Sequence, residues 1–356
     1  MRIASRAFAA VAAALILFSF VVPAPVRAAG ELVLDGETVA DADTYAAAKK
    51  EGKVTLYSTF ILTSMKEVMA KFQADTGITA ENVRLTTAQM YDRVVAEATA
   101  GKLAADYVDL TDVTLVMQLA QKGILRAHKV PDFTAIPAVL RDRDGKWYSV
   151  MRSLMAIGVN TAVVPPADVP TKWSDLLAPR FRGKVGFMTI DSGGTAFSQF
   201  FFLHQRYGAE YWRALAAQQG RIYPTSSPLA TDLARGEVSV AVAPVDALLD
   251  DVRSGAPVKI VAPAEGVPGY TVSGGLTASG PHPHAADVFM NWITSKRGLA
   301  AVAASGAYGS RNNAPAPVNP AVGFPPAEAV YNIRPADYLS SRDALTREWH
   351  SIFGSR

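Results

Sequence analysis

Short apolar runs alternate with amphipathic stretches along most of the chain. In its first part the apolar runs predict strands at residues 53–57, 83–85 and 106–110. Each run is followed by a polar loop and by apolar residues at the helical period, which predict helices at residues 65–76, 87–100 and 113–121. Strand, polar loop and helix in repeated succession predict a parallel α/β sheet.

The same pattern begins again after residue 172. Apolar runs predict further strands at residues 184–188, 238–242 and 258–262. Helical periodicity, with aromatic residues in the first stretch, predicts helices at residues 196–207, 210–219, 226–235 and 245–254. The second part of the chain is therefore expected to form a second α/β unit.

Two longer apolar stretches are placed to connect these units. Residues 149–159 are mostly apolar with β-branched members, which is typical of a strand buried on both faces. Residues 268–278, after a Pro-Gly turn, predict a return strand. Two chain crossings predict the fold class: α/β, with two lobes joined by a two-crossing hinge. We expect lobe 1 to comprise residues 29–152 and 269–311, and lobe 2 residues 153–268 and 325–356.

The N-terminus has the pattern of a secretory signal peptide. Arg2 and Arg6 precede an apolar segment at residues 7–22, and a small-residue cleavage pattern ends at Ala28. The alternative is a retained membrane anchor, for which this segment is short, since a spanning helix needs about 20 residues. Cleavage of residues 1–28 near Ala28 predicts an exported protein, periplasmic in a bacterium with two membranes.

Charge and cysteine content narrow the classes of function. Without residues 1–28, 32 basic residues face 32 acidic ones, and no run of Lys or Arg of the kind that binds nucleic acid occurs. The chain has no cysteine, which excludes disulfides, a thiol nucleophile, thiolate-held metal and a lipid-anchored cysteine. We expect a soluble monomer that binds no nucleic acid and carries no cofactor.

Catalytic motifs are missing from the sequence. It contains no Gly-x-Ser-x-Gly elbow, no phosphate-binding loop and no histidines at zinc spacing. We therefore expect a binding protein rather than an enzyme, with no metal ligands. A scaffold or adhesin is a further alternative, against which the compact α/β repeats argue.

Polar loops after strand ends supply the candidate ligand-binding residues. In two-lobed α/β proteins such loops and the helix N-termini face the cleft, where unpaired N–H groups suit anions. The candidates from these loops are Ser58, Thr59, Thr87, Ser192, Gly193, Gly194 and Thr195. The paired glycines would let a ligand approach the backbone. Ser226 and Ser227, which also begin a helix, are interpreted as caps rather than ligand residues.

One full charge, Arg152, interrupts the crossing stretch. A guanidinium keeps its proton, so a buried one requires a partner. Arg152 is either paired with an internal aspartate or faces the cleft and awaits an anion; our hypothesis is the second. Tyr270, on the return strand, either lines the cleft or packs the hinge.

A set of short landmarks in a fixed order resembles a known family. Their residues read EGKVTLYS at 51–58, FQADTG at 72–77, AEATAG at 96–101, VNT at 159–161, WSDLL at 173–177, PRFRGK at 179–184, RGEV at 235–238 and HPHAA at 282–286. Together they resemble the type 2 periplasmic solute-binding proteins of ABC importers, and within them the ferric-binding-protein-like group. The resemblance covers nearly the whole chain after residue 28. It implies capture of a small solute between two lobes and delivery to an ABC permease in the inner membrane.

The resemblance also bears on the ligand. Ferric members use adjacent tyrosines on the segment after the Arg-Gly-Glu strand, but here residues 242–249 read VAPVDALL. Asp246 lies near the expected place, and a single carboxylate makes a poor iron site. We therefore expect a small organic anion, a carboxylate or phosphonate, with Arg152 as its bidentate partner. Ferric iron bound with a synergistic anion is the alternative.

Overall fold

The computed structural model describes residues 30–60, 62–319 and 322–354. The predicted signal peptide, residues 1–28, lies outside the described residues. Among the helices that are described, none has the length and apolar character needed to cross a membrane.

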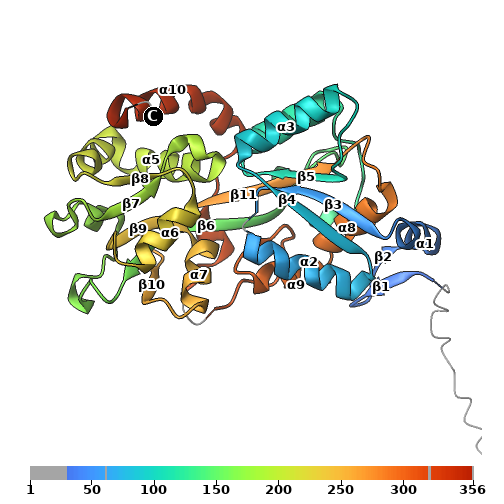
Figure 1. The fold of residues 1–356 in the computed structure, drawn as a ribbon, viewed down its shortest axis with the longest axis horizontal. Coiled ribbons are helices and arrows are strands. Elements are labelled where there is room, and N and C mark those ends of the chain that lie inside the picture. The colour runs from blue at the N-terminus through green and yellow to red at the C-terminus, as the bar shows by residue number, and fades with distance from the viewer. Residues whose placement is uncertain (1–29, 61, 320–321, 355–356) are drawn as a thin grey trace, which may run out of the picture.

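Two α/β lobes lie side by side and are joined by two long strands (Figure 1). These strands are β6 (Tyr148–Asn160) and β11 (Val267–Leu276), which pair antiparallel over Tyr148 to Leu154 of β6. The remaining part of β6, Met155 to Val159, pairs with β9 of the second lobe. The two predicted crossings and the two-lobed fold class are therefore confirmed. The predicted residue limits of the lobes stay a prediction.

The first lobe is built on a parallel sheet that ends on β11. Its strands are β3 (Lys53–Ser58), β4 (Thr79–Arg84) and β5 (Tyr107–Leu110), in the order β4-β3-β5-β11. β3 runs parallel to both neighbours, and β5 pairs antiparallel with β11. The helices around this sheet are α1 (Ala42–Glu51), α2 (Leu62–Thr76), α3 (Thr87–Thr99), α4 (Val113–Gln121), α8 (Pro283–Thr294) and α9 (Lys296–Ala304).

The second lobe repeats this plan on β6. Its strands are β7 (Val185–Met188), β8 (Arg221–Tyr223), β9 (Val240–Pro244) and β10 (Val258–Val261), in the order β6-β9-β7-β8 with β10 also on β6. β7 runs parallel to both β8 and β9. Its helices are α5 (Gly194–Ala217), α6 (Ser226–Ala234) and α7 (Val245–Arg253).

Smaller elements complete the chain. The hairpin of β1 (Leu32–Leu34) and β2 (Glu37–Ala40) forms its own two-stranded sheet, while β12 (Tyr308–Gly309) pairs with β6 and β13 (Val330–Tyr331) with β11. Short 3-10 helices lie at Phe133–Ala135, Ala138–Leu140, Pro166–Asp168, Trp173–Leu177, Pro179–Phe181, Ile190–Ser192 and Ala327–Ala329.

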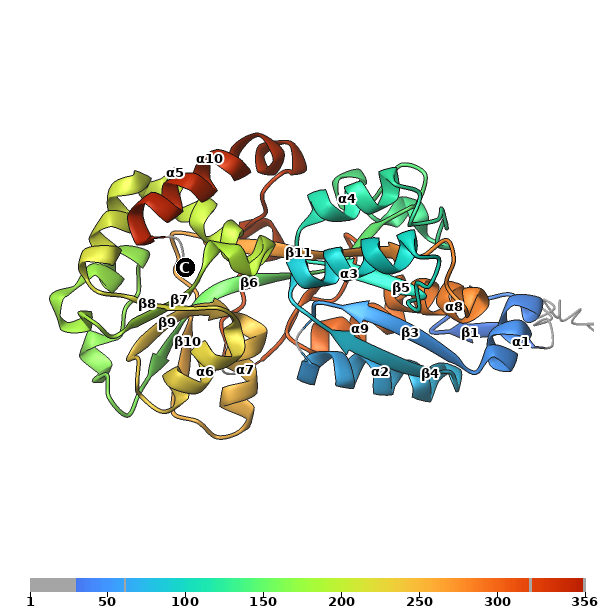
Figure 2. The ribbon, with the colours of Figure 1, turned by 45° about the horizontal axis from the view of Figure 1, so that its top comes forward.

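The last helix, α10 (Pro335–Phe353), lies along α5 (Figure 2). Its Tyr338 ring packs against Phe197 of α5, with ring centroids 4.5 Å apart. From there it reaches the first lobe, where the Tyr338 hydroxyl donates to Asp112 Oδ2 (3.0 Å) and Arg342 Nη1 lies 2.7 Å from the same oxygen. The C-terminal helix thus belongs by packing to the second lobe and bridges to the first.

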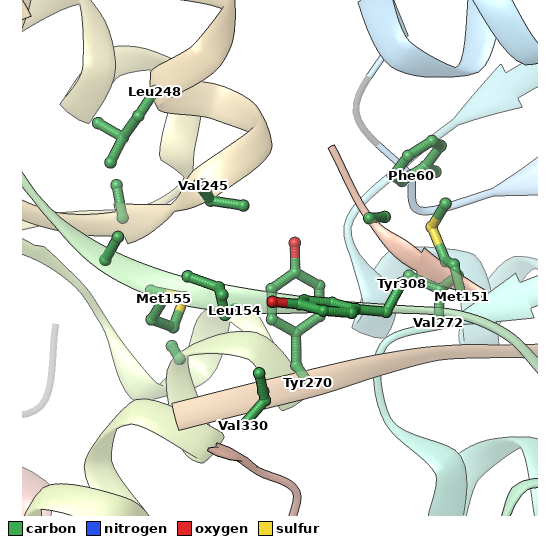
Figure 3. Close-up of a cluster of buried hydrophobic side chains, with 14 of the residues drawn as sticks. Phe60, Met151, Leu154, Met155, Val245, Leu248, Tyr270, Val272, Tyr308 and Val330 are labelled. Carbon is green, nitrogen blue, oxygen red and sulfur yellow. The ribbon is translucent and has the colours of Figure 1, made fainter. Parts of the chain in front are cut away.

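Apolar burial continues from both lobes through the hinge. Figure 3 shows Tyr270 of β11 at the junction of the lobes, with Leu154 and Val245 on one side and Phe60 and Met151 on the other. All five side chains are buried and belong to one hydrophobic core. Continuous packing of this kind restricts where the two crossing strands bend and keeps the loops at the strand ends in place.

The element pattern is largely as predicted, with differences that have physical reasons. β4 begins at Thr79 rather than at residue 83, because it is an edge strand and its polar residues are exposed to solvent. The two helices expected at residues 196–219 form one element kinked at Gly208, whose φ is 71°. The short β8 and the helix α9 were not predicted.

Candidate functional site

A cleft lies between the lobes at the carboxyl ends of their parallel strands. Strands β3, β4 and β5 end there from one side and β7, β8 and β9 from the other, which is where α/β sheets bind ligands. The cleft has a cavity volume of about 70 Å³. Its lining residues are Thr59, Phe60, Arg84, Leu85, Thr86, Thr87, Thr111, Met188, Ser192, Thr195, Thr225, Ser226, Pro244, Asp246, Tyr270 and Val272.

Several helices begin at this cleft. Residues at the start of α3, α5, α6 and α7 line it. The N-cap side chain of α3, Thr86, accepts a hydrogen bond from Gln89 N, whereas in the described chain the N-cap residues of α5, α6 and α7 make no side-chain capping bond. First-turn N–H groups without a side-chain cap attract negative charge. The N-termini of α5 and α6 are therefore suited to an anion, whereas at α7 the first-turn Asp246 carboxylate already receives backbone N–H groups.

Arg84 contributes a positive charge from the first lobe. It is the last residue of β4, in register with Ser58 of β3, and its Nε donates to the carbonyl oxygen of Phe60 (3.0 Å). Among the described residues that line the cleft, it is the one cationic side chain. A guanidinium with one N–H used in this way keeps further N–H groups for bidentate contact with a carboxylate or phosphonate.

Asp246 and Tyr270 form a buried pair in the cleft. The Tyr270 hydroxyl donates to Asp246 Oδ1 (3.0 Å), and neither side chain is more than 6% exposed. Burial raises the pKa of Asp246 to about 6, against the lowering effect of the bond from Tyr270. Burial also raises the pKa of Tyr270 well above its usual value, while the charge of Arg84 acts the other way. The second oxygen, Asp246 Oδ2, is buried without a partner within the described chain.

A second buried carboxylate, Asp109, positions the loop after β3. Asp109 Oδ1 accepts from the backbone N–H of Thr59 (2.8 Å) and from its hydroxyl (3.0 Å). Burial raises the pKa of Asp109 to about 6, opposed by hydrogen bonds from Ser58, Thr59 and Tyr107. Ser58 Oγ also accepts from Phe60 N (3.1 Å). These hydrogen bonds hold Thr59 at the cleft, and Ser58 stabilises the same loop without lining the cleft itself.

The paired glycines bring the two lobes into contact. A side chain on Gly194 would overlap the carbonyl oxygen of Thr111 in the first lobe and lie 2.7 Å from its carbonyl carbon. Gly193 has a φ of 118°, and a Cβ there would lie 3.0 Å from Thr87. Thr87 Oγ1 and Thr111 Oγ1 are 2.7 Å apart. What approaches the glycine backbone is therefore the opposite lobe.

The structure brings most of the predicted site residues together. Thr59, Thr87, Ser192, Thr195, Asp246 and Tyr270 line the cleft. Ser58, Gly193 and Gly194 lie next to it, in the roles just described, and are not among its lining residues.

Arg152 is not brought to this cleft. It stands on β6 in register with Tyr308 on one side and Thr271 on the other, and its Nη2 donates to the carbonyl oxygen of Gly309 (3.2 Å). Burial lowers its pKa, and its Nε has no hydrogen-bond partner among the described residues. The crossing strand alternates its side chains between two faces, and the position of Arg152 is on the face opposite to Ser153 and Tyr270.

Several residues that line the cleft were missed or misinterpreted, among them Arg84, Thr111, Thr225 and Ser226. Arg84 and Thr111 follow the same rule that singled out Thr59, since each stands at or directly after a strand's end. Ser226 was interpreted as a cap, but Thr225 occupies the N-cap position and both line the cleft. Applied to the predicted strand at residues 106–110, the strand-end rule would have identified Thr111, whereas Thr225 and Ser226 follow β8, which was not predicted.

The two buried carboxyls predict how stability depends on pH. Asp109 and Asp246 have a pKa of about 6 when folded, above the usual value of about 3.9 for an unfolded chain. The folded chain therefore binds their protons more tightly, and the free energy of unfolding should rise by about 1 kcal/mol for each group between pH 7 and pH 5. Urea unfolding at several pH values measures this, and Asp109→Asn should flatten the dependence. A free energy of unfolding that falls between pH 7 and pH 5, in both the unchanged protein and Asp109→Asn, would contradict the raised pKa values of the two carboxyls.

A family model matches most of the chain. Residues 103–341 match the model described as bacterial extracellular solute-binding protein. The matched segment contains β5, both crossing strands and the whole second lobe up to the first third of α10.

Two curated relatives match parts of the chain. One, named an uncharacterized protein, from Haemophilus influenzae, is 27% identical over 193 residues, or 51% of this chain and 56% of its own. Iron uptake protein A1 from Synechocystis sp. is 25% identical over 137 residues, or 38% of this chain and 37% of its own. The chain thus matches just over half and just over a third of the lengths of these relatives.

Solved structures share the fold over nearly their full length. The periplasmic binding protein AfuA from Actinobacillus pleuropneumoniae, with fructose-6-phosphate bound, has a TM-score of 0.71 and 18% identity, covering 86% of this chain and 100% of its own. Iron-bound HitA from Pseudomonas aeruginosa has a TM-score of 0.67 and 19% identity, covering 83% and 99%. Because these sequence identities are low, the similarity to the two structures shows a shared fold and nothing more.

Proposed function

Because the chain belongs to the bacterial extracellular solute-binding protein family, we propose that it is the periplasmic substrate-binding protein of an ABC importer. It captures a small organic anion, a carboxylate or phosphonate, in the cleft between its lobes and closes by bending at the two crossing strands. The loaded protein then docks on the permease in the inner membrane. The family binds solutes, and the proposal assigns no catalytic step to the chain.

The observation that carries the proposal is the charge arrangement of the cleft. Arg84 stands at the end of β4, and the N-termini of α5 and α6, which lack side-chain caps in the described chain, line the same cleft from the second lobe. A carboxylate or phosphonate between them would receive N–H groups from both lobes, so binding would favour the closed arrangement. This assigns to Arg84 the anion-binding role that the sequence alone suggested for Arg152.

A thermal-shift screen of small carboxylates, phosphonates and ferric salts against the purified mature protein tests the proposal. A ligand present at about 100 times its dissociation constant stabilises the folded state by about 2.7 kcal/mol. We expect stabilisation by members of one anion class. Stabilisation by ferric salts alone, or by uncharged solutes alone, would contradict the proposal.

Ferric iron with a synergistic anion is the second candidate, and the Asp246–Tyr270 pair favours it. A carboxylate and a phenol oxygen, 3.0 Å apart in the cleft, are hard oxygen donors of the kind that Fe(III) prefers. Iron bound by Tyr270 would give a visible phenolate-to-iron charge-transfer band on titration with ferric citrate, and Tyr270→Phe would abolish it. For an organic anion we expect no band.

A further inference from the structure

Two hydroxyl groups that line the cleft, those of Ser192 and Thr59, donate their protons inside the protein. Ser192 Oγ donates to the carbonyl oxygen of Pro224 (2.8 Å), which can only accept. The Thr59 hydroxyl donates to the carboxylate of Asp109 (3.0 Å). Both hydroxyls have therefore used their one proton inside the protein, and toward the cleft each offers only lone pairs.

Asp246 adds a stronger acceptor to these two. Its side chain is fully buried, Oδ1 accepts from Tyr270, and Oδ2 has no partner within the described chain. A buried carboxylate oxygen without a donor is unfavourable, so its retention in a ligand cleft calls for a functional explanation. Among its described lining residues the cleft thus has one cationic side chain, Arg84, and the acceptors Asp246, Thr59 and Ser192.

We infer that Asp246 is a specificity-determining residue that accepts a hydrogen bond from an O–H or N–H group of the ligand. This inference rests on the proposed function, and it narrows the ligand to an anion that also carries a donor. The acid group binds Arg84 and the helix N-termini, and the donor completes the bonding of Asp246 Oδ2. An anion without a donor leaves that oxygen unpaired and binds more weakly.

Two matched series of probes test this inference by calorimetry. The first is succinate, malate and aspartate, and the second is ethylphosphonate, 2-hydroxyethylphosphonate and 2-aminoethylphosphonate. Within each series the donor changes from none to hydroxyl to ammonium; the hydroxyl member keeps the charge of its parent, and the ammonium member adds one positive charge. We expect a donor-bearing member to bind at least about tenfold tighter than its parent, and D246N to remove that advantage. Whichever binds more tightly, the hydroxyl or the ammonium member, shows which kind of donor Asp246 prefers.

Asp246→Asn in the free protein supplies a test that needs no ligand. If the carboxylate is kept for a ligand rather than for the fold, removing its charge should raise the midpoint of thermal unfolding at pH 8. A lowered midpoint would mean that Asp246 serves the fold, and it would overturn the inference.

The outcomes separate the two proposals. If parent anions bind as tightly as donor-bearing ones, or if D246N preserves the preference, the inference about Asp246 is wrong while the anion site stands. If no probe of either series binds, the proposed anion classes are wrong, and the unfolding midpoint of D246N alone decides the role of Asp246.

Discussion

Replacing Arg84 by methionine is expected to weaken binding of the anionic ligand by roughly 10- to 150-fold. Methionine keeps much of the length of the side chain but removes the hydrogen bonds from the guanidinium to the ligand, a loss that we set at about 1.5–3 kcal/mol in total. Isothermal titration calorimetry with the anion identified by the thermal-shift screen measures the loss. Arg84→Lys keeps the charge and loses the bidentate geometry, so its affinity for the anion should lie between those of the unchanged protein and Arg84→Met.

Arg152→Met is the matched control for this experiment. Arg152 bonds the carbonyl oxygen of Gly309 and does not line the cleft, so its replacement should leave affinity within about twofold and act on thermal stability instead. The opposite pattern, with affinity lost in Arg152→Met and kept in Arg84→Met, would restore Arg152 as the ligand's partner and would invalidate the site described above.

Gly194→Ala is expected to weaken ligand binding by roughly 5- to 150-fold without unfolding the protein. The added methyl group would overlap the backbone of Thr111 in the opposite lobe, which cannot move aside as a side chain can. Relieving the overlap requires the lobes to separate, and overpacking of this kind costs about 1–3 kcal/mol. The cost falls on the arrangement in which the lobes are in contact, so it appears as lost affinity.

Gly323→Ala provides the matched control, because a Cβ at Gly323 would meet nothing within 4 Å. Affinity should be unchanged in this variant. Small-angle X-ray scattering adds a direct measure of lobe separation: at saturating ligand, the radius of gyration of Gly194→Ala should exceed that of the unchanged protein. Equal affinity and equal radius in Gly194→Ala would show that the glycine contact plays no part in closure.

The sequence could predict the fold because the fold depends on patterns that are local. Apolar runs of strand length, followed by polar loops and helical periodicity, correctly predicted both lobes and both crossing strands. The start of β4 was missed because an edge strand at Thr79 tolerates polar residues. The helix α9, which Ser295 alone separates from the end of α8, was also missed.

The candidate site was predictable only in part, because membership of a cleft depends on which way a strand faces. The strand-end rule pointed to Thr59 and Ser192, and the family resemblance pointed to Asp246; all three line the cleft. It could not show that Arg152, in the middle of a strand, lies on the face opposite to Tyr270, since a one-residue shift reverses the face. The role of Gly194 depends on a contact with Thr111, which is distant in sequence, and no local pattern predicts such a contact.

A crystal structure of the protein with the anion identified by the screen tests the central claim most directly. It should place the acid group of the ligand within hydrogen-bond distance of the Arg84 guanidinium and of the first-turn N–H groups of α5 or α6. A ligand bound outside the cleft, or an acid group held by Arg152 with Arg84 turned to solvent, would contradict the account.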